Sequence, residues 1–110
     1  MITRSKIRQY VKSLAKTFKP ERVILFGSYA RGRPGDDSDV DLLVVMDHAQ
    51  PRNIEQAINT RLRMDAPFPM DMLVRKPLDI GRRLAQGDSF LSGIMRDGKV
   101  LYDRTRQRMD

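Results

Sequence analysis

The sequence predicts an α/β (α+β) fold in which helices pack on one small mixed β-sheet. Helical and strand-like segments alternate along the chain, ending in two short helices and a last strand, and this order is typical of helices layered on a sheet. A chain of 110 residues buries roughly two-thirds of its unfolded surface, enough for one hydrophobic core. We therefore expect a single domain over residues 1–103 and a basic C-terminal tail over residues 104–110.

The helices are predicted from apolar residues that recur at helical spacing. The first covers about residues 4–18, before Pro20, and its apolar positions are Ile7, Tyr10, Val11, Leu14 and Phe18. The second begins after Pro51-Arg52-Asn53, where Asn53 and Gln56 predict a capping box, and its apolar face carries Ile54, Ala57, Ile58 and Leu62. Two short helices near 78–86 and 88–96 follow, with Gly98 as a C-cap or turn residue.

The strands are short, β-rich apolar runs. Residues 23–26 form a buried strand, and Gly27-Ser28 ends it before a helical turn at residues 29–31. Residues 39–46 form the second strand, after a loop over residues 32–38. Its residues 42–45 are apolar on both faces, which predicts a central strand. Residues 70–74 lie between two prolines and form a third strand, and residues 99–102 form a short edge strand. The tail after it is expected to be disordered or bound to a partner.

Composition narrows the class of protein. Hydrophobic residues make up 40% and charged residues 32% of the chain, which is typical of a soluble globular domain. No apolar run reaches the ~20 residues that cross a bilayer, and the N-terminus has no signal segment. We therefore expect a cytoplasmic protein with no membrane contact. The chain has no cysteine, which excludes disulfides, thiolate zinc sites and cysteine nucleophiles.

The net charge of +7 is unevenly distributed. Lysine and arginine crowd the first helix and the tail, whereas acidic residues gather in the middle of the chain, from Asp36 to Asp47. One interpretation is a solvated helix face followed by a frayed tail. The other is a surface for an acidic protein or for RNA.

Gly27-Ser28 is a candidate phosphate-binding turn. A glycine between a strand and a helix leaves backbone N–H groups open to a phosphate at the positive end of the helix dipole. The Ser28 hydroxyl can donate a hydrogen bond to a phosphate oxygen, and Arg31 follows one turn later. The alternative is an ordinary turn, because Gly-Ser after a strand is common.

Asp39-Val40-Asp41 is a candidate metal-binding pair. Strand periodicity places the two carboxylates on one face, roughly 7 Å apart, where they repel by about 2 kcal/mol at an effective dielectric near 20. A divalent cation offsets this repulsion, and hard oxygen ligands suit magnesium. The alternative is that one aspartate caps the loop while the other is solvated. Ser38, directly before the pair, is included among the candidate nucleotide-binding residues.

Asp71 lies in the apolar third strand, where its neighbours predict burial. If that strand lies beside the second, three carboxylates can form a two-metal site for phosphoryl or nucleotidyl transfer. The alternative is an aspartate at an exposed strand end. An EF-hand starting at Asp37 is excluded, because its glycine and glutamate positions hold Leu42 and His48.

Together these residues resemble the DNA polymerase β-like nucleotidyltransferase superfamily. Its signature is Gly-Ser, about ten residues, Asp-x-Asp and a third acid on a later strand; here these are Gly27-Ser28, Asp39-Val40-Asp41 and Asp71. The runs from Gly27 to Gly32 and from Asp97 to Tyr102 look like its minimal nucleotidyltransferase (MNT) branch. That branch is often encoded beside HEPN-domain proteins.

The resemblance implies a nucleotidyltransferase fold and a chemistry. Gly27 and Ser28 would hold the triphosphate of ATP, and Asp39 and Asp41 would ligate two magnesium ions. Asp71 would bind one of these ions and help to deprotonate the acceptor hydroxyl, so that AMP is transferred and pyrophosphate leaves. MNT proteins of such pairs act as antitoxins that bind a HEPN ribonuclease toxin, adenylylate a tyrosine on it, or both.

Three functions follow from these expectations. The favoured one is transfer of AMP to a HEPN toxin, because the sequence has no room for a domain that binds an acceptor. The second is a catalytically silent antitoxin that inhibits the toxin by binding. The third is a nucleotidyltransferase acting on RNA or a small molecule, for which the basic first helix and tail are the only support.

Overall fold

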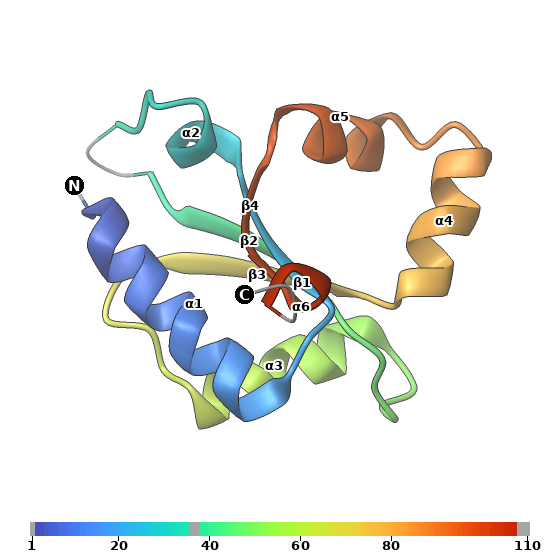
Figure 1. Ribbon diagram of the computed structural model, residues 1–110, viewed down its shortest axis with the longest axis horizontal. Helices are drawn as coiled ribbons and strands as arrows, with labels where there is room; N and C mark the ends of the chain where they lie inside the picture. Colours follow the sequence, from blue (N-terminus) through green and yellow to red (C-terminus); the bar gives the residue numbers. More distant parts are fainter. Residues whose placement is uncertain (1, 36–37, 108–110) are drawn as a thin grey trace.

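A computed structural model, described here for residues 2–35 and 38–107, has helices on both faces of a four-stranded sheet (Figure 1). This confirms the predicted fold class. The elements are α1 (Arg4–Phe18), β1 (Arg22–Phe26), α2 (Gly27–Ala30), β2 (Val40–Val45), α3 (Asn53–Arg63), β3 (Met70–Arg75), α4 (Pro77–Ala85), α5 (Ser89–Asp97), β4 (Lys99–Asp103) and α6 (Arg104–Gln107). Asp36 and Asp37 of the predicted loop, and residues 108–110 of the tail, lie outside the described residues.

The strand order in the sheet is β3-β2-β1-β4. β1 runs antiparallel to both β2 and β4, whereas β2 and β3 are parallel. A parallel pair needs a crossover connection, and α3 supplies it between β2 and β3. The prediction that β2 is central and β4 lies at an edge is confirmed, and β3 lies beside β2, as the three-carboxylate hypothesis requires.

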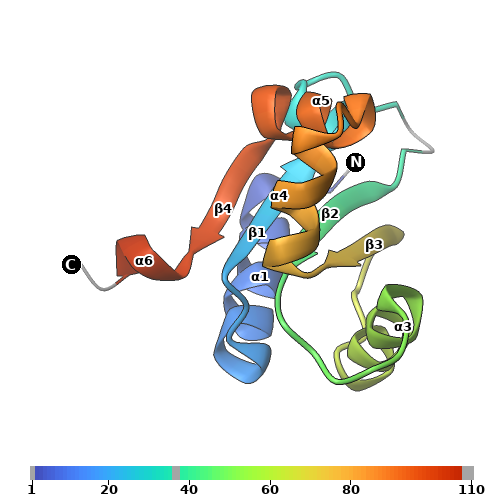
Figure 2. The ribbon, with the colours of Figure 1, turned by 90° about the vertical axis from the view of Figure 1, so that its right-hand side faces the viewer.

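Helices cover both faces of the sheet (Figure 2), and each face carries its own hydrophobic cluster. One face carries α1 and α3, and here Leu14, Val23 and Leu42 are fully buried. The other face carries α4 and α5, where Ile80 and Ile94 pack over Leu43. Alternate residues of β2 serve opposite clusters, which explains why the strand is apolar on both faces. Asp41, Leu43 and Val45 share the α4–α5 face because a strand repeats every two residues.

α3 departs from the sequence prediction in two ways. Its N-cap is Arg52 without a side-chain hydrogen bond, so the capping box is wrong. Asn53 instead lies inside the helix, and its Oδ1 is 2.7 Å from Nε2 of His48. Of the four residues predicted to share the apolar face, Ala57 is buried while the others are exposed, by 61% at Ile54, 50% at Ile58 and 78% at Leu62.

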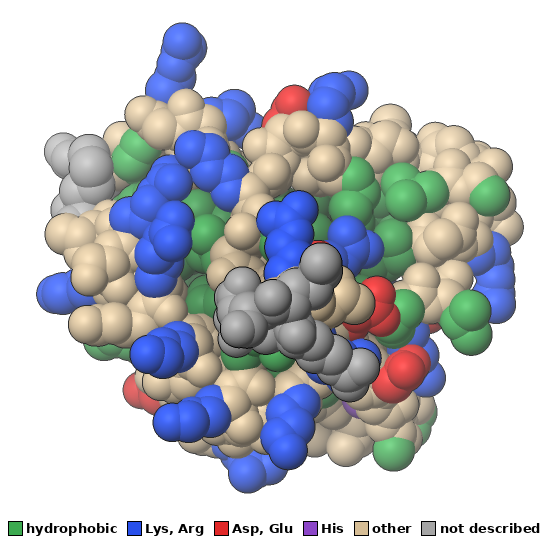
Figure 3. Space-filling view, in the orientation of Figure 1, with side chains coloured by type: hydrophobic (Ala, Val, Ile, Leu, Met, Phe, Trp, Pro, Cys, Tyr) green, Lys and Arg blue, Asp and Glu red, His purple; other side chains and the backbone are tan. Residues whose placement is uncertain are grey.

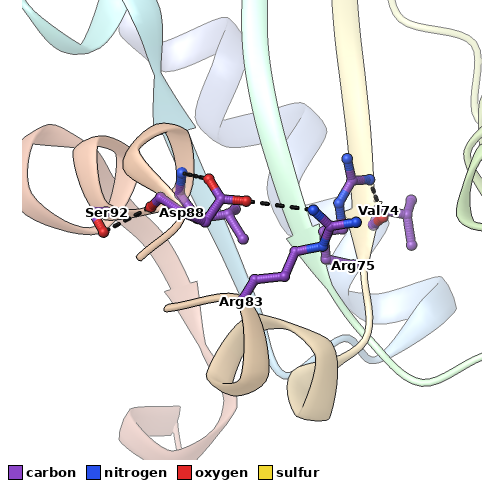
Figure 4. Close-up of polar contacts among 6 residues, drawn as sticks. Val74, Arg75, Arg83, Asp88 and Ser92 are labelled. Carbon is purple, nitrogen blue, oxygen red and sulfur yellow. Dashed lines mark hydrogen bonds and ion pairs between the residues drawn. The ribbon is translucent and has the colours of Figure 1, made fainter. Parts of the chain in front are cut away.

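Asp88 holds α5 in position above the sheet (Figure 4). Its Oδ1 accepts a hydrogen bond from the Leu91 N–H at 2.9 Å, which caps the helix. Its other oxygen lies 3.5 Å from Nη1 of Arg83 on α4. The Ser92 hydroxyl donates to the Asp88 carbonyl at 2.8 Å. The start of α5, which carries Phe90, is thereby fixed relative to α4.

The C-terminal part of the domain agrees with the sequence prediction at Gly98 and disagrees after it. Gly98 is the C-cap of α5, and its N–H donates to Ile94 O at 2.8 Å. Of the two expectations for the tail, disorder is wrong for residues 103–107, since Asp103 ends β4 and α6 follows. None of the helices in the described residues has the length and apolar character needed to cross a membrane.

Candidate active site

Gly27 lies directly against the carboxylate of Asp41. Its φ of 74° is in the left-handed region that favours glycine. A Cβ at this position would overlap Asp41 Oδ2 and lie 3.1 Å from its Cγ. The glycine is therefore required for two reasons: the backbone turns sharply from β1 into α2, and the turn touches Asp41, one of the three predicted acids.

The turn is anchored by the residues that follow it. Tyr29 and Ala30 are buried in the α1 cluster, and the Tyr29 hydroxyl accepts a hydrogen bond from the Ile2 N–H at 3.1 Å. Ser28 is half-buried, and Arg31 is exposed at the C-cap of α2. Gly27 and Ser28 thus have a fixed position at the C-terminal end of β1. The exposed Arg31 side chain can reach a ligand at this turn.

Asp41 and Asp71 are register partners on the parallel strands β2 and β3. Register partners project from the same face of a sheet on strands about 4.8 Å apart, so the two acids are neighbours. Asp39 is exposed and lies just before β2, not within the strand as predicted. The backbone thus places Asp41 beside Asp71, with Asp39 two residues before Asp41. The burial predicted for Asp71 from its neighbours is wrong, since Asp71 is exposed.

The electrostatics of Asp41 reflect this arrangement. Burial raises the pKa of the Asp41 carboxyl, and the negative charges of Asp71 and then Asp39 raise it further. The nearby Arg31 guanidinium acts in the opposite direction and lowers this pKa. Three carboxylates and one guanidinium therefore interact here, and the negative charge is only partly compensated.

The donor set suits a hard cation, although the side chains do not enclose one. Across residues 2–35 and 38–107, no three acidic or histidine side chains converge closely enough to form a metal-binding group. Carboxylate oxygens are nevertheless the ligands that magnesium prefers, and a cation between Asp41 and Asp71 would relieve the repulsion that raises the Asp41 pKa. The residues present fit a divalent ion by their chemistry, and side-chain rotations would have to complete its coordination.

Two hollows meet at an aromatic pair above the acids. Phe26 and Phe90 pack edge to face, with ring centroids 5.9 Å apart and planes at 89°. The Gly27 hollow, about 360 Å³, is lined by Phe26, Gly27, Ala30, Arg31, Ser89, Phe90, Gly93, Ile94, Asp97 and Gly98. The Asp71 hollow, about 370 Å³, is lined by Phe26, Asp41, Ile54, Ala57, Ile58, Arg61, Asp71, Met72, Leu73 and Phe90. A ligand in either hollow therefore touches the same two rings.

The remaining sequence candidate has a local role. The Ser38 hydroxyl accepts a hydrogen bond from the Gly35 N–H at 2.8 Å and so closes the loop before β2. Sequence reasoning missed Phe26, Phe90 and Asp97 as lining residues. Phe26 precedes the Gly-Ser turn and offered a signal by position, whereas Phe90 and Asp97 reach the site only through the packing of α5.

The basic surface lies apart from the acids. Lysine and arginine side chains gather over α1 (Figure 3), and a groove of about 400 Å³ is lined by Arg8, Val11, Lys12, Ala15, Lys16, Leu101 and Tyr102. This groove shares none of its lining residues with the two hollows. The cationic face of α1 therefore belongs to a separate surface.

Comparison with known sequences agrees with the geometry. The profile of a family described as nucleotidyltransferase domain matches residues 4–91. A Methanocaldococcus jannaschii protein with the provisional name protein adenylyltransferase MJ0604 is 29% identical over 98 residues, covering 87% of this chain and 94% of that protein. A second protein of that organism and provisional name, MJ1305, is 31% identical over 90 residues, covering 74% of this chain and 58% of that protein.

Two solved structures share the architecture. A Sulfolobus solfataricus protein with the provisional name nucleotidyltransferase, solved at 1.40 Å resolution, has a TM-score of 0.64 and 24% identity, covering 92% of this chain and 80% of that one. A chain of a toxin–antitoxin structure with AMP-PNP has a TM-score of 0.56 and 19% identity, covering 93% of this chain and 77% of that one. At these identities the likeness concerns the fold.

Proposed function

Because the chain belongs to the nucleotidyltransferase domain family, we propose that this nucleotidyltransferase moves AMP from ATP to a hydroxyl group of another protein. The observation that carries the proposal is the contact between two elements far apart in the sequence. The Gly27 backbone lies against Asp41, and Asp41 is the register partner of Asp71. A phosphate at the turn would therefore lie beside paired acids.

The proposed roles follow from this order of groups. Backbone N–H groups at Gly27 and Ser28 bind the phosphates of ATP, because the glycine leaves no side chain in the way, and Arg31 neutralises part of their charge. Asp39 and Asp41, with Asp71, would hold two magnesium ions. These ions, when bound, supply charge neutralisation of the triphosphate and polarise its α-phosphate. Ser38 acts through the loop, since its hydroxyl is used by Gly35.

The proposed reaction is a single in-line displacement. The acceptor oxygen forms a bond to the α-phosphorus while the bond from that phosphorus to the bridging oxygen breaks, and pyrophosphate leaves. Asp71 takes the proton of the acceptor hydroxyl, because it is the exposed member of the acidic pair and faces the second hollow. Positioning and electrostatics supply most of the catalysis of such transfers.

The proposed acceptor is a tyrosine of a HEPN ribonuclease toxin, which the chain would neutralise as its antitoxin in the cytoplasm. Two relatives with the provisional name of protein adenylyltransferase and a toxin–antitoxin structural neighbour with AMP-PNP support this acceptor class. Inhibition by binding alone is the rival function. Its support is the same structural neighbour, and it differs in requiring no acid at Asp39, Asp41 or Asp71.

The test uses ATP labelled at the α-phosphate, magnesium and the protein encoded by the neighbouring reading frame. We expect label on that protein with the wild-type chain and at least about 100-fold less with Asp39→Asn, since loss of one electrostatic contact to the transition state costs on the order of 10²-fold in rate. Lys12→Gln, on the separate basic groove, is the control. If the wild type labels no protein acceptor, the proposed transfer is wrong. If Asp39→Asn still neutralises the toxin, binding suffices.

A further inference from the structure

Helix α3 turns its three large apolar side chains to the solvent and buries two polar ones, Gln56 and Thr60, beside Ala57. Thr60 is 0% exposed and Gln56 8% exposed, and their side chains hydrogen bond to each other at 3.1 Å. The Thr60 hydroxyl also donates to Gln56 O at 2.9 Å. The polar groups on the buried face therefore have hydrogen-bond partners within α3. Ile54, Ile58 and Leu62 recur every four residues along the exposed face.

This exposed face continues into the active site. Ile54 and Ile58 line the Asp71 hollow together with Arg61, and the same hollow ends at Asp41 and Asp71. Leu62 extends the row by one further turn and is 78% exposed. Contiguous exposed apolar side chains rimmed by polar residues are typical of interaction surfaces, and this row lies beside a hollow that contains two of the candidate acids.

We propose that the exposed face of α3, formed by Ile54, Ile58, Arg61 and Leu62, is the docking surface for the protein acceptor. The inference rests on the proposed function, because it assumes that the acceptor hydroxyl belongs to a protein. It adds the surface that recognises the acceptor, on the opposite side of the Phe26–Phe90 pair from Gly27. ATP phosphates and acceptor then approach the acids through different hollows, as an in-line transfer requires.

The lining of the Asp71 hollow selects the chemistry of the docked residue. Its walls are mostly aliphatic and aromatic, and its carboxylates are the groups that accept a proton. A tyrosine matches this arrangement, since it has an apolar ring and a hydroxyl at its end. Among the described lining residues, the hollow's one cation is Arg61, which comes from α3, whereas its carboxylates come from β2 and β3. We therefore expect an acidic residue of the partner to contact Arg61 on the α3 side, away from Asp41 and Asp71.

Charge favours an acidic partner over a second copy of the chain. Arg61 is exposed and lies on this face, and the chain carries a net charge of +7. Two copies meeting through this face would bring like charges together, which costs binding free energy. A partner with acidic groups around an apolar patch would gain binding free energy both from contact with the apolar row and from attraction to Arg61.

The experiment measures binding of the neighbouring reading frame's product without nucleotide, by isothermal titration. The test variant is the double change Ile58→Gln and Leu62→Gln. The matched control is Leu78→Gln on α4, because Leu78 is 78% exposed, as Leu62 is. Glutamine keeps the helix propensity of both sites. Thermal melts of all three proteins, monitored by circular dichroism, verify that the substitutions leave the fold intact.

We expect the double variant to bind the partner at least about tenfold more weakly, since each buried apolar side chain contributes on that scale, and Leu78→Gln to bind as the wild type does. Equal binding by the double variant would overturn the docking surface, even where AMP transfer persists. If the wild type forms a dimer that the double variant no longer forms, while Leu78→Gln still does, the face binds a second copy of the chain, and that result would also overturn the proposed docking of the acceptor. Binding through α3 without any AMP transfer would instead uphold the surface and refute transfer to this partner.

Discussion

Replacing Asp41 by asparagine is predicted to make the metal-free protein more stable while removing its activity. Asp41 is half-buried, and Asp71 is its register partner on the adjacent parallel strand. Burial and the charges of Asp71 and Asp39 all raise its pKa, so the charged form is unfavourable in the folded state. Asparagine keeps the shape of the side chain beside Gly27 and removes the charge.

The size of the effect follows from the separation of the two strands. Parallel strands lie about 4.8 Å apart, and two unit charges about 5 Å apart repel by about 1 kcal/mol in water and about 3 kcal/mol at an effective dielectric near 20. Asp71 is exposed, so solvent screens the pair and the lower figure applies. A gain of about 1 kcal/mol raises the melting temperature of a domain of this size by about 4 °C.

The assay is calorimetric unfolding from pH 7 to pH 4 in EDTA. A raised carboxyl pKa in the folded state contributes stability that is present below the unfolded pKa and is lost as pH rises through the folded value. The advantage of Asp41→Asn should therefore be complete at pH 7 and shrink as pH falls through the raised pKa of Asp41. Magnesium should stabilise the wild type and leave Asp41→Asn nearly unchanged.

Asp47→Asn is the matched control, because Asp47 is an exposed aspartate shortly after the same strand. Its melting temperature should stay close to that of the wild type at every pH. If Asp41→Asn melts below the wild type at pH 7 in EDTA, the acids do not repel one another as described. The case for a cation between them would then lose its physical basis.

Three further predictions concern the fold around the site. Gly27→Ala should lower the free energy of unfolding by about 1–3 kcal/mol from its left-handed φ alone, and should weaken ATP binding through contact of the new Cβ with Asp41. Gly87→Ala, also left-handed but away from the acids, should lower stability only. Equal ATP affinity in both alanine variants would contradict this role of Gly27. Asp88→Ala should lower the melting temperature by removing the α5 cap. Hydrogen bonds from the Leu91 N–H and from Arg83 lower the pKa of the Asp88 carboxyl, so the higher melting temperature of the wild type should persist above the unfolded pKa and disappear as pH falls through the folded pKa. Leu43→Ala, in the α4–α5 cluster, should cost about 2–5 kcal/mol in urea unfolding, against a change near zero for Leu78→Ala on the surface.

Local patterns in the sequence predicted much of the fold. α1 is amphipathic, and four of the five residues that the helical spacing selects are buried, whereas Phe18 is partly buried at the end of the helix. β2 is apolar on both faces because each face meets a different cluster. The sequence predicted that the three acids would lie close together if β3 lay beside β2. In the structure β3 does lie beside β2, and Asp41 and Asp71 are register partners.

Features that depend on tertiary packing could not be predicted in this way. The orientation of α3 follows from the pair Gln56 and Thr60, whose mutual hydrogen bonds make a polar face suitable for burial, while hydrophobic periodicity alone selects the opposite face. Phe90 reaches Phe26 through the position of α5, whose start Asp88 caps. Gly27 was selected for phosphate access, yet its contact with Asp41 is visible only when β1 and β2 are paired.

The central claim is that Gly27 and the three acids form one site that holds ATP together with a divalent ion. Isothermal titration of the purified chain with ATP, in magnesium and then in EDTA, tests it most directly and needs no acceptor. We expect binding that depends on magnesium and is lost in Asp41→Asn, whereas Lys12→Gln, on the separate basic groove, should bind as the wild type does. Equal ATP affinity in magnesium and in EDTA, or in Asp41→Asn and the wild type, would contradict it.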